Sequence, residues 1–282
     1  MIRFDKQNEF SSTYETAARE LLRTTPVDRG SWQSGAAPSP VYELEDAIFH
    51  FEVPALPRLW EQEIYGPSDE RDDFVNLNRQ WAEDHFQERV SGQPLNPAPS
   101  YLNWPWHSEK YREQYKGVGW KNRHNRQTPF DHTYPERMWP KLTDGTPEFP
   151  QPMSGIRFDY GDLKDVIDLL KRDPFTRQAY LPIWFPEDTG SASGQRVPCT
   201  LGYHFIRYGA RLNIKYFIRS CDLTRHLTND VYMAGRLLQY VALHLEGARS
   251  SHMGLPLVGD LTMFVSNLHM FTADAWRYER TV

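Results

Sequence analysis

The sequence has 282 residues, of which 39% are hydrophobic and 24% charged, so it can bury a full core without disulfide or metal staples. A formal net charge of −5 and an isoelectric point near 6.1 argue against binding to a polyanion through excess Lys and Arg, but leave a small phosphate ligand open. The two cysteines, Cys199 and Cys221, form neither a disulfide framework nor a zinc ribbon, and the ten histidines are scattered without metal-ligand spacing. We therefore expect a reducing compartment and no metal.

Motifs of several common protein classes do not occur in the sequence. The first ten residues have no apolar signal-peptide core, and no segment approaches the length that crosses a bilayer, so we expect a cytoplasmic protein. There is no P-loop, no HExxH and no Gly-x-Ser-x-Gly elbow. P-loop, zinc-peptidase and α/β-hydrolase chemistries are therefore unsupported.

Two amphipathic helices are predicted in the first third of the chain. The first covers residues 13–23, and its apolar face consists of Tyr14, Ala17, Ala18, Leu21 and Leu22. A polar loop, residues 27–31, follows and contains Arg29. The second helix covers residues 74–90, and its candidate buried stripe consists of Phe74, Leu77, Trp81 and Phe86.

Residues 93–151 show no sustained helical or strand period and are rich in Pro, Trp, Tyr and His. Disordered segments are poor in aromatic residues, so this composition indicates an ordered, loop-rich insert over the active site. A third helix is predicted at residues 162–172, where Pro174 stops it. Its inward positions are Leu163, Val166, Ile167 and Leu170.

The segment 196–232 is the most informative part of the sequence. Residues 203–208 and 212–218 carry the aromatic and β-branched residues of two strands, and Tyr208-Gly209-Ala210 is a plausible tight turn between them. Cys199 precedes this hairpin, and Arg219-Ser220-Cys221-Asp222 follows it. The hairpin therefore gathers a thiol, an arginine and a carboxylate.

A helix and a strand are predicted after the hairpin. Thr228 or Asn229 is the expected N-cap of the helix. Its apolar positions recur at helical spacing and are Val231, Ala234, Leu237, Leu238, Val241 and Leu245. Residues 261–271 are the strand candidate.

These motifs resemble the thymidylate synthase family. The resemblance rests on four features in chain order: Pro-Cys at Cys199, two strands, Arg-Ser-x-Asp from Arg219, and a helix that opens eleven residues after that arginine. Asn229-Asp230 is similar to the phage deoxycytidylate hydroxymethylase branch, whereas thymidylate synthases proper have asparagine at the position of Asp230. The resemblance is strong over residues 173–271. It implies an α/β (α+β) sandwich around a mixed, largely antiparallel sheet with flanking helices, one domain over residues 1–282, and a homodimer that joins its sheets back to back.

The resemblance also implies a phosphate site shared between subunits. In the family a loop cation near the start of the chain closes over the nucleotide phosphate, and Arg29 lies in a similar loop. Arg177-Gln178 stands where the family has an Arg-Arg pair that reaches the partner's phosphate, so only the first arginine is kept. The expected phosphate ligands are Arg29, Arg219, Ser220 and Arg177 from the other subunit, because guanidinium forks match phosphate oxygens.

The family places a catalytic glutamate in the second helix, in the pattern Glu-x-x-Trp/Phe. Glu83 fits this pattern, and we prefer it for catalysis and for contact with the folate; Glu88 is the alternative. Residues 134–139 are similar to the family segment that lines the pyrimidine and folate pocket. The resemblance therefore implies that Tyr134 binds substrate and Trp139 binds cofactor. The other substrate-binding residues that it implies are Asp222, Asn229 and His269.

Cys199 is the expected nucleophile, because a nearby arginine favours a thiolate. Ring carbon 5 of a pyrimidine is not nucleophilic, but thiolate addition at carbon 6 makes it enamine-like. Carbon 5 can then take a one-carbon unit from 5,10-methylenetetrahydrofolate. Water addition to the resulting methylene gives a hydroxymethyl group, and hydride transfer gives a methyl group. A glutamate such as Glu83 would relay protons and order this water.

Asp230 is the residue expected to select the base. A carboxylate mainly accepts hydrogen bonds, which suits a cytosine amino group and a protonated ring nitrogen, whereas an asparagine suits uracil. We therefore expect a deoxycytidylate 5-hydroxymethyltransferase, and we count Asp230 among its catalytic residues. Such an enzyme would serve nucleotide biosynthesis for phage DNA modification. It would act in the host cytoplasm if a phage encodes it. The alternatives are a deoxycytidylate methylase, a uridylate-directed synthase or hydroxymethylase, and a silent nucleotide-binding regulator, against which the presence of Cys199 argues.

Overall fold

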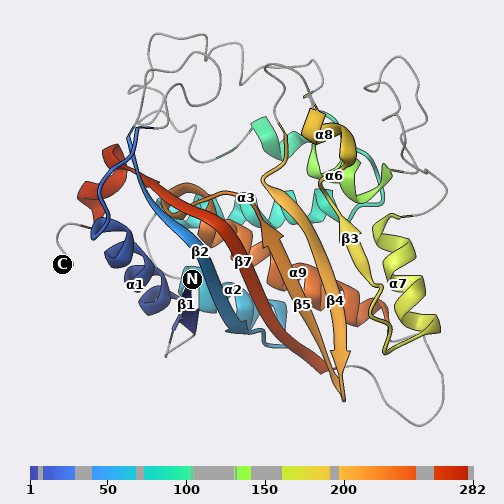
Figure 1. The fold of residues 1–282 in the computed structure, drawn as a ribbon. Coiled ribbons are helices and arrows are strands. Elements are labelled where there is room, and N and C mark those ends of the chain that lie inside the picture. Colours follow the sequence, from blue (N-terminus) through green and yellow to red (C-terminus); the bar gives the residue numbers. More distant parts are fainter. Residues whose placement is uncertain are drawn as a thin grey trace.

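The computed structural model describes residues 1–5, 9–28, 40–67, 73–102, 104, 130, 132–140, 161–190, 197–245 and 257–278. One sheet runs through this part of the chain in the order β1-β2-β7-β5-β4-β3, and β6 pairs with β7 (Figure 1). The strands are β1 (Ile2–Asp5), β2 (Val41–Glu52), β3 (Tyr180–Pro182), β4 (Thr200–Tyr208), β5 (Arg211–Ile218), β6 (Cys221–Asp222) and β7 (Leu257–Phe271). The described α-helices are α1 (Phe10–Leu22), α2 (Pro57–Tyr65), α3 (Asp73–Arg89), α6 (Tyr134–Met138), α7 (Leu163–Arg172), α8 (Pro186–Gly190) and α9 (Thr228–His244).

The sheet mixes antiparallel and parallel pairs, which confirms the expected fold class. The antiparallel ladders join β2 to β7, β3 to β4 and β4 to β5. The parallel ladders join β1 to β2, β5 to β7 and β6 to β7. A parallel pair needs a crossover between its strands, and α9 supplies the crossover from β5 to β7.

The two faces of the sheet have different surroundings. On β5, the side chains of Leu212, Ile214, Tyr216 and Ile218 are buried, and the residues between them are half-buried. Helices α2, α3 and α9 lie behind the sheet in Figure 1, where α9 contacts both β5 and β7. On the opposite side, which we name the open face, Ile48, Phe264 and Phe217 pair across β2, β7 and β5. The rings of Phe264 and Phe217 stack there at 5.1 Å.

The predicted hairpin and the body of the helix after it are confirmed. Gly209 has φ +56° in the turn between β4 and β5, a conformation in which glycine meets no steric cost. The six apolar positions predicted for α9 are all buried. They face the sheet because their spacing places them on one side of the helix.

The predicted N-cap of that helix is wrong. A π-helical turn, Leu223–Leu227, runs directly into α9, so the helical path begins five residues before Thr228. The Asp222 carboxylate caps this turn by accepting hydrogen bonds from the backbone N–H groups of Thr224 at 2.9 Å and Arg225 at 3.1 Å. A cap at Thr228 or Asn229 is unnecessary, because the backbone N–H groups that lack a helical partner lie upstream, at the start of the π-helical turn.

The other predicted helices form with small shifts. Helix α1 begins at Phe10 rather than residue 13, α3 covers Asp73–Arg89, and α7 starts after Asp162, whose side chain accepts from the Asp165 N–H in a capping box. Leu77 was expected in the buried stripe of α3, but its exposed fraction is 55%. That expectation is wrong; Trp81 and Phe86 do face inward, and the side chain of Phe74 lies outside the described residues.

Parts of the insert at residues 93–151 are described, and they lie against α3. The Trp81 indole N–H donates to the Ser100 carbonyl at 2.8 Å, and the Trp139 indole N–H donates to the Arg89 carbonyl at 2.9 Å. The remainder, including residues 105–129 and 141–151, falls outside the described residues. Across the described ranges, every helix is too short or too polar to traverse a lipid bilayer.

Candidate active site

Cys199 lies directly before β4, and its side chain is half-buried against the core. The backbone N–H of Arg219, at the end of β5, donates to the Cys199 carbonyl at 2.9 Å. Arg219 Nε also donates to the Pro198 carbonyl at 3.0 Å. The pairing of β4 with β5 thus brings the predicted nucleophile and a predicted phosphate ligand to the same end of the hairpin.

Tyr134 reaches this place from α6. Its hydroxyl accepts a hydrogen bond from Thr200 Oγ1 at 3.2 Å, and the same Thr200 oxygen lies 2.9 Å from the Tyr216 hydroxyl. Burial raises the pKa of Tyr134, and the nearby charge of Cys199 raises it further. Tyr134 is therefore a neutral phenol beside the thiol.

Asp230 and Asn229 occupy the first turn of α9 but have different partners. The amide of Asn229 accepts from the Tyr65 hydroxyl at 2.7 Å and donates to Asn78 Oδ1 at 3.2 Å, which ties it to α2 and α3. Asp230 Oδ2 lies 3.8 Å from Cys221 Sγ. Burial raises the pKa of Asp230 to about 6, while the positive charge of Arg89 lowers it. Asp230 is thus mainly a carboxylate at neutral pH.

Ser220, His269 and Asp222 form a second group next to the thiol. The Ser220 hydroxyl lies 3.5 Å from His269 Nδ1, and Asp222 pairs with His269 in the β6–β7 ladder. Burial lowers the pKa of His269 to about 4, so the ring is neutral and can exchange hydrogen bonds with a hydroxyl group. Burial raises the pKa of Asp222 to about 7, and its carboxylate is occupied by the cap of α9 and by Arg225.

The two candidate glutamates lie on different sides of α3. Glu83 accepts from the Tyr232 hydroxyl at 2.7 Å and from Arg236 Nη2 at 2.8 Å. Burial opposes ionisation of Glu83, but hydrogen bonds from Arg236, Gln87 and Tyr232 outweigh it and lower the pKa. Glu88 accepts from the Ser100 backbone N–H at 2.7 Å and from its hydroxyl. Both carboxylates are thus engaged, and the geometry does not choose between them.

The two arginines expected at the phosphate are not seen beside Cys199. Arg29 lies outside the described residues. Arg177 is exposed in the segment between α7 and β3, and its carbonyl lies 3.1 Å from His204 Nε2 on β4. His204 belongs to the open face, so Arg177 adjoins that face rather than the thiol of its own chain.

Sequence reasoning missed His85 and Arg89, which line the site from α3. The Arg89 guanidinium lies 4.0 Å above the Tyr134 ring, and its Nη2 is 3.0 Å from His85 Nε2. Trp81, His85 and Arg89 are four residues apart and therefore share one face of the helix. That spacing was the available signal, because a polar pair on the buried face of a helix needs a partner.

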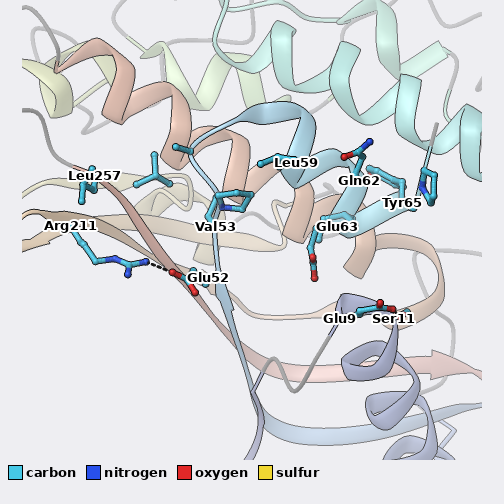
Figure 2. Close-up of a pocket in the computed structure, with 16 residues that line it drawn as sticks. Glu9, Ser11, Glu52, Val53, Leu59, Gln62, Glu63, Tyr65, Arg211 and Leu257 are labelled. Atoms are coloured by element: carbon cyan, nitrogen blue, oxygen red, sulfur yellow. Dashed lines mark hydrogen bonds and ion pairs between the residues drawn. The ribbon is translucent and has the colours of Figure 1, made fainter.

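A large groove lies apart from these residues. Its volume is about 1130 Å³, and none of the described site residues lines it. Figure 2 shows it between α2 and the ends of the strands, with Glu52 and Arg211 joined across 3.0 Å at one side. Pro67 and Leu257, which line it, adjoin segments outside the described residues.

One comparison with known proteins identifies the family of the chain. A family model described as "Thymidylate synthase" matches residues 106–275, which is more than half of the sequence and includes Cys199, Arg219, Asp230 and His269. A search of curated proteins finds no match. The chain belongs to the thymidylate synthase family.

Proposed function

We propose that this protein is a deoxycytidylate 5-hydroxymethyltransferase that works through a covalent adduct at Cys199. The family transfers one-carbon units to carbon 5 of pyrimidine nucleotides and generally takes them from methylenetetrahydrofolate. The observation that carries the proposal is Asp230, a carboxylate in the first turn of α9 whose Oδ2 lies 3.8 Å from Cys221 Sγ, at the position where thymidylate synthases proper have asparagine.

Cys199 is the proposed nucleophile of the covalent step. The thiolate adds to ring carbon 6, and the electron pair of the carbon 5–carbon 6 double bond shifts to carbon 5 and the ring atoms conjugated with it, so that carbon 5 becomes the nucleophile. Tyr134, a neutral phenol beside the thiol, can exchange a hydrogen bond with the reacting groups. After carbon 5 has taken the one-carbon unit and lost its proton, tetrahydrofolate would leave, water would add to the exocyclic methylene that remains, and elimination of the thiolate would regenerate Cys199.

The sugar and phosphate have a binding site next to the thiol. Arg219 and Ser220 follow β5 directly, where a guanidinium and a hydroxyl match phosphate oxygens. His269 is neutral because burial lowers its pKa to about 4, and a neutral ring can accept a hydrogen bond from a sugar hydroxyl. We propose Asp222 and Asn229 as residues that hold α9 in place around this nucleotide.

Asp230 supports cytosine as the base. A carboxylate accepts from the cytosine amino group, whereas the uracil carbonyl would face an acceptor without a proton. With a pKa of about 6, Asp230 is mainly ionised at neutral pH, so the accepting form predominates.

The open face supports a homodimer with shared sites. Ile48, Phe217 and Phe264 are half-buried there, so a second copy of the sheet would remove them from water. Arg177 adjoins this face, because its carbonyl lies 3.1 Å from His204 Nε2. We therefore propose Arg177 as a phosphate ligand in trans, with Arg29 as its counterpart from the same chain.

Methylenetetrahydrofolate is the proposed carbon donor, as the family generally uses it. Trp139, proposed to contact it, has an exposed fraction of 8%, and its N–H is bound to the Arg89 carbonyl. Trp139 would therefore offer only a small part of its surface to a folate. Glu83 or Glu88 is the proposed proton relay.

The product identifies the reaction. We expect incubation with methylenetetrahydrofolate and deoxycytidylate to add the mass of a hydroxymethyl group, as read by mass spectrometry, and deoxyuridylate to react less well. A methyl product would mean that the protein is a deoxycytidylate methylase. Faster turnover of deoxyuridylate than of deoxycytidylate would contradict the role given to Asp230.

The covalent step is tested without folate. Wild-type protein should release tritium from carbon 5 of deoxycytidylate, because thiolate addition makes that position exchangeable, and Cys199→Ala should abolish both release and turnover. Cys221→Ala is the matched control, since Cys221 is buried. Exchange that persists in Cys199→Ala means that another residue is the nucleophile.

A further inference from the structure

Arg89 is a buried cation that contacts two side chains of the site. Its exposed fraction is 4%, its guanidinium lies 4.0 Å above the Tyr134 ring, and its Nη2 lies 3.0 Å from His85 Nε2. Within the described residues, its Nε has no hydrogen-bond partner. Burial of a guanidinium is costly unless its surroundings compensate, and here the face of an aromatic ring does so in part. The placement of Arg89 over Tyr134 therefore points to a role for this contact.

The contact with Arg89 fixes the protonation of His85. A guanidinium donates hydrogen bonds and cannot accept them, so His85 Nε2 is the acceptor and carries no proton. The single proton of the ring is then on Nδ1, which donates to the Ser100 hydroxyl oxygen at 2.8 Å. The Ser100 hydroxyl in turn donates to Glu88 Oε2. We name these hydrogen-bonded residues the polar chain; they are Glu88, Ser100, His85 and Arg89.

Ser100 anchors the polar chain, because α3 binds each of its polar groups. Its backbone N–H donates to Glu88 Oε1 at 2.7 Å, and its carbonyl accepts from the Trp81 indole N–H at 2.8 Å. Its hydroxyl lies between Glu88 and His85. The His85 ring also stacks on Trp81 at 4.9 Å. The polar chain is thus held at each step before it reaches Arg89.

The other end of the polar chain meets Tyr134, which contacts the residue that follows Cys199. Arg89 covers the face of the Tyr134 ring, and the Tyr134 hydroxyl accepts from Thr200 Oγ1 at 3.2 Å. Thr200 is the next residue after Cys199. A cation is attracted to the negative face of a ring and not to its positive edge, so Arg89 favours one orientation of Tyr134. The polar chain therefore bears on where the Tyr134 hydroxyl lies relative to Cys199.

We propose that the polar chain positions the Tyr134 phenol for the covalent step at Cys199. This inference rests on the proposed function and adds the group of residues that holds Tyr134. The chain acts through Tyr134, so its members need no contact with the nucleotide. Loss of a link in the chain should matter only while the Tyr134 hydroxyl is present, because this hydroxyl is what the chain positions.

The tautomer of His85 tests whether the polar chain exists. In the wild-type protein labelled with ¹⁵N, NMR distinguishes a protonated from an unprotonated ring nitrogen, and His85→Gln assigns the signals. We expect a proton on Nδ1 and none on Nε2 from about pH 6 to about pH 8, because Arg89 can donate only to a bare Nε2.

Ser100→Ala tests whether the polar chain acts through Tyr134. It removes the hydroxyl between His85 and Glu88 without adding volume, and it should slow tritium release from carbon 5 of deoxycytidylate by about tenfold. In a Tyr134→Phe background, the same substitution should change the release by less than about twofold, whereas a merely structural effect would lower both rates alike. Ser91→Ala is the matched control and should keep the wild-type rate, since its exposed hydroxyl donates only to the Glu88 carbonyl, at 2.8 Å.

Three results overturn the inference and leave the proposed function intact. They are a proton on His85 Nε2, a Tyr134→Phe variant that releases tritium like the wild type, and an equal effect of Ser100→Ala in both backgrounds. Should Tyr134→Phe release too little tritium to measure, the ¹³C signals of the Tyr134 ring decide, because signals that do not move in Ser100→Ala contradict the inference. Should Ser100→Ala fail to fold, the His85 tautomer decides.

Failure of the proposed function looks different. A wild-type protein that folds but releases no tritium removes the proposed covalent step, and with it the use of Tyr134 in that step. The His85 tautomer would still report whether the polar chain forms, because it is read without a nucleotide.

Discussion

Asp230 and Asn229 differ in what their side chains are free to do. The Asn229 amide is held by Tyr65 and Asn78, so it fixes the start of α9 against two other helices. Asp230 lies near the Cys221 thiol and is influenced by the positive charge of Arg89. Its carboxylate oxygens can still accept hydrogen bonds from a ligand. Asn229 therefore anchors the helix, and Asp230 is the residue that we propose to face the base.

Asp230→Asn should move preference from deoxycytidylate toward deoxyuridylate, since an amide can donate to the uracil carbonyl. An unpaired polar contact costs about 1–3 kcal/mol, which corresponds to a change on the order of ten- to a hundredfold in the ratio of kcat/KM values. Steady-state kinetics with both nucleotides measure it. Asp222→Asn is the control, because Asp222 caps the turn before α9 and its loss should lower both rates alike. An unchanged ratio in Asp230→Asn would show that this side chain does not select the base.

Some site residues could be predicted from sequence because they lie in one short segment. Cys199, Arg219 and Asp230 are positioned by a hairpin and the helix that follows it, all of which have clear local patterns. Arg89 could not be found in the same way. Its partners His85 and Tyr134 are brought together by the contact between α3 and α6, which no local pattern reports.

Helix α6 depends on contacts outside itself, because a helix of five residues is not stable alone. Thr133 and Glu136 form a capping box at its start. Arg137 makes a buried, bidentate ion pair with Asp188, at 2.8 and 2.9 Å. These contacts set where Tyr134 lies relative to Cys199.

Arg137→Met should destabilise the protein by about 3–5 kcal/mol, because it removes one partner of a buried, bidentate ion pair with Asp188. It should also reduce turnover, since α6 carries Tyr134. Urea denaturation measures the first effect and steady-state kinetics the second. Arg3→Met is the matched control: Arg3 pairs with Asp5, but the two side chains are 62% and 52% exposed, so the loss should stay below about 1 kcal/mol. Equal losses in the two variants would mean that the Arg137–Asp188 pair does not hold α6.

The elements that could be predicted are those with a regular apolar period. Helix α7 has both a period and a capping box, and β5 alternates buried and half-buried residues along its length. Strand β2 was not predicted, although residues 47, 49 and 51 alternate in burial with their neighbours. The two-residue period breaks at Asp46, which has φ +54° and is skipped in the register with β7, so the apolar pattern is interrupted near the middle of the strand.

At the scale of the whole molecule, the open face and Arg177 lead to one prediction about assembly. If each site takes Arg177 from the partner, Arg177→Ala and Cys199→Ala should both be inactive alone. Mixing them after unfolding and refolding should restore about a quarter of the wild-type activity, because half of the dimers are hybrids with one complete site. An activity assay on the mixture measures this.

A mixture of Cys199→Ala with Arg219→Ala is the control, since both residues serve the same subunit's site and no complete site can form. Full activity of a monomer, shown by light scattering, would contradict the shared site. If the unmixed Arg177→Ala variant is active, Arg177 is not a phosphate ligand, although the protein can still be a dimer.

Strand β7 has a consequence for how the protein is made. It pairs with β2 on one side and β5 on the other, so it joins the β1-β2 part of the sheet to the β5-β4-β3 part. The ribosome synthesises every other strand of the described sheet before this one. Until residue 271 has left the exit tunnel, the nascent chain has two separate sheet fragments, and His269, which lies on β7, has not reached Ser220. The sheet can therefore be completed only after β7 has been synthesised, and the unpaired edges of β2 and β5 need protection until then.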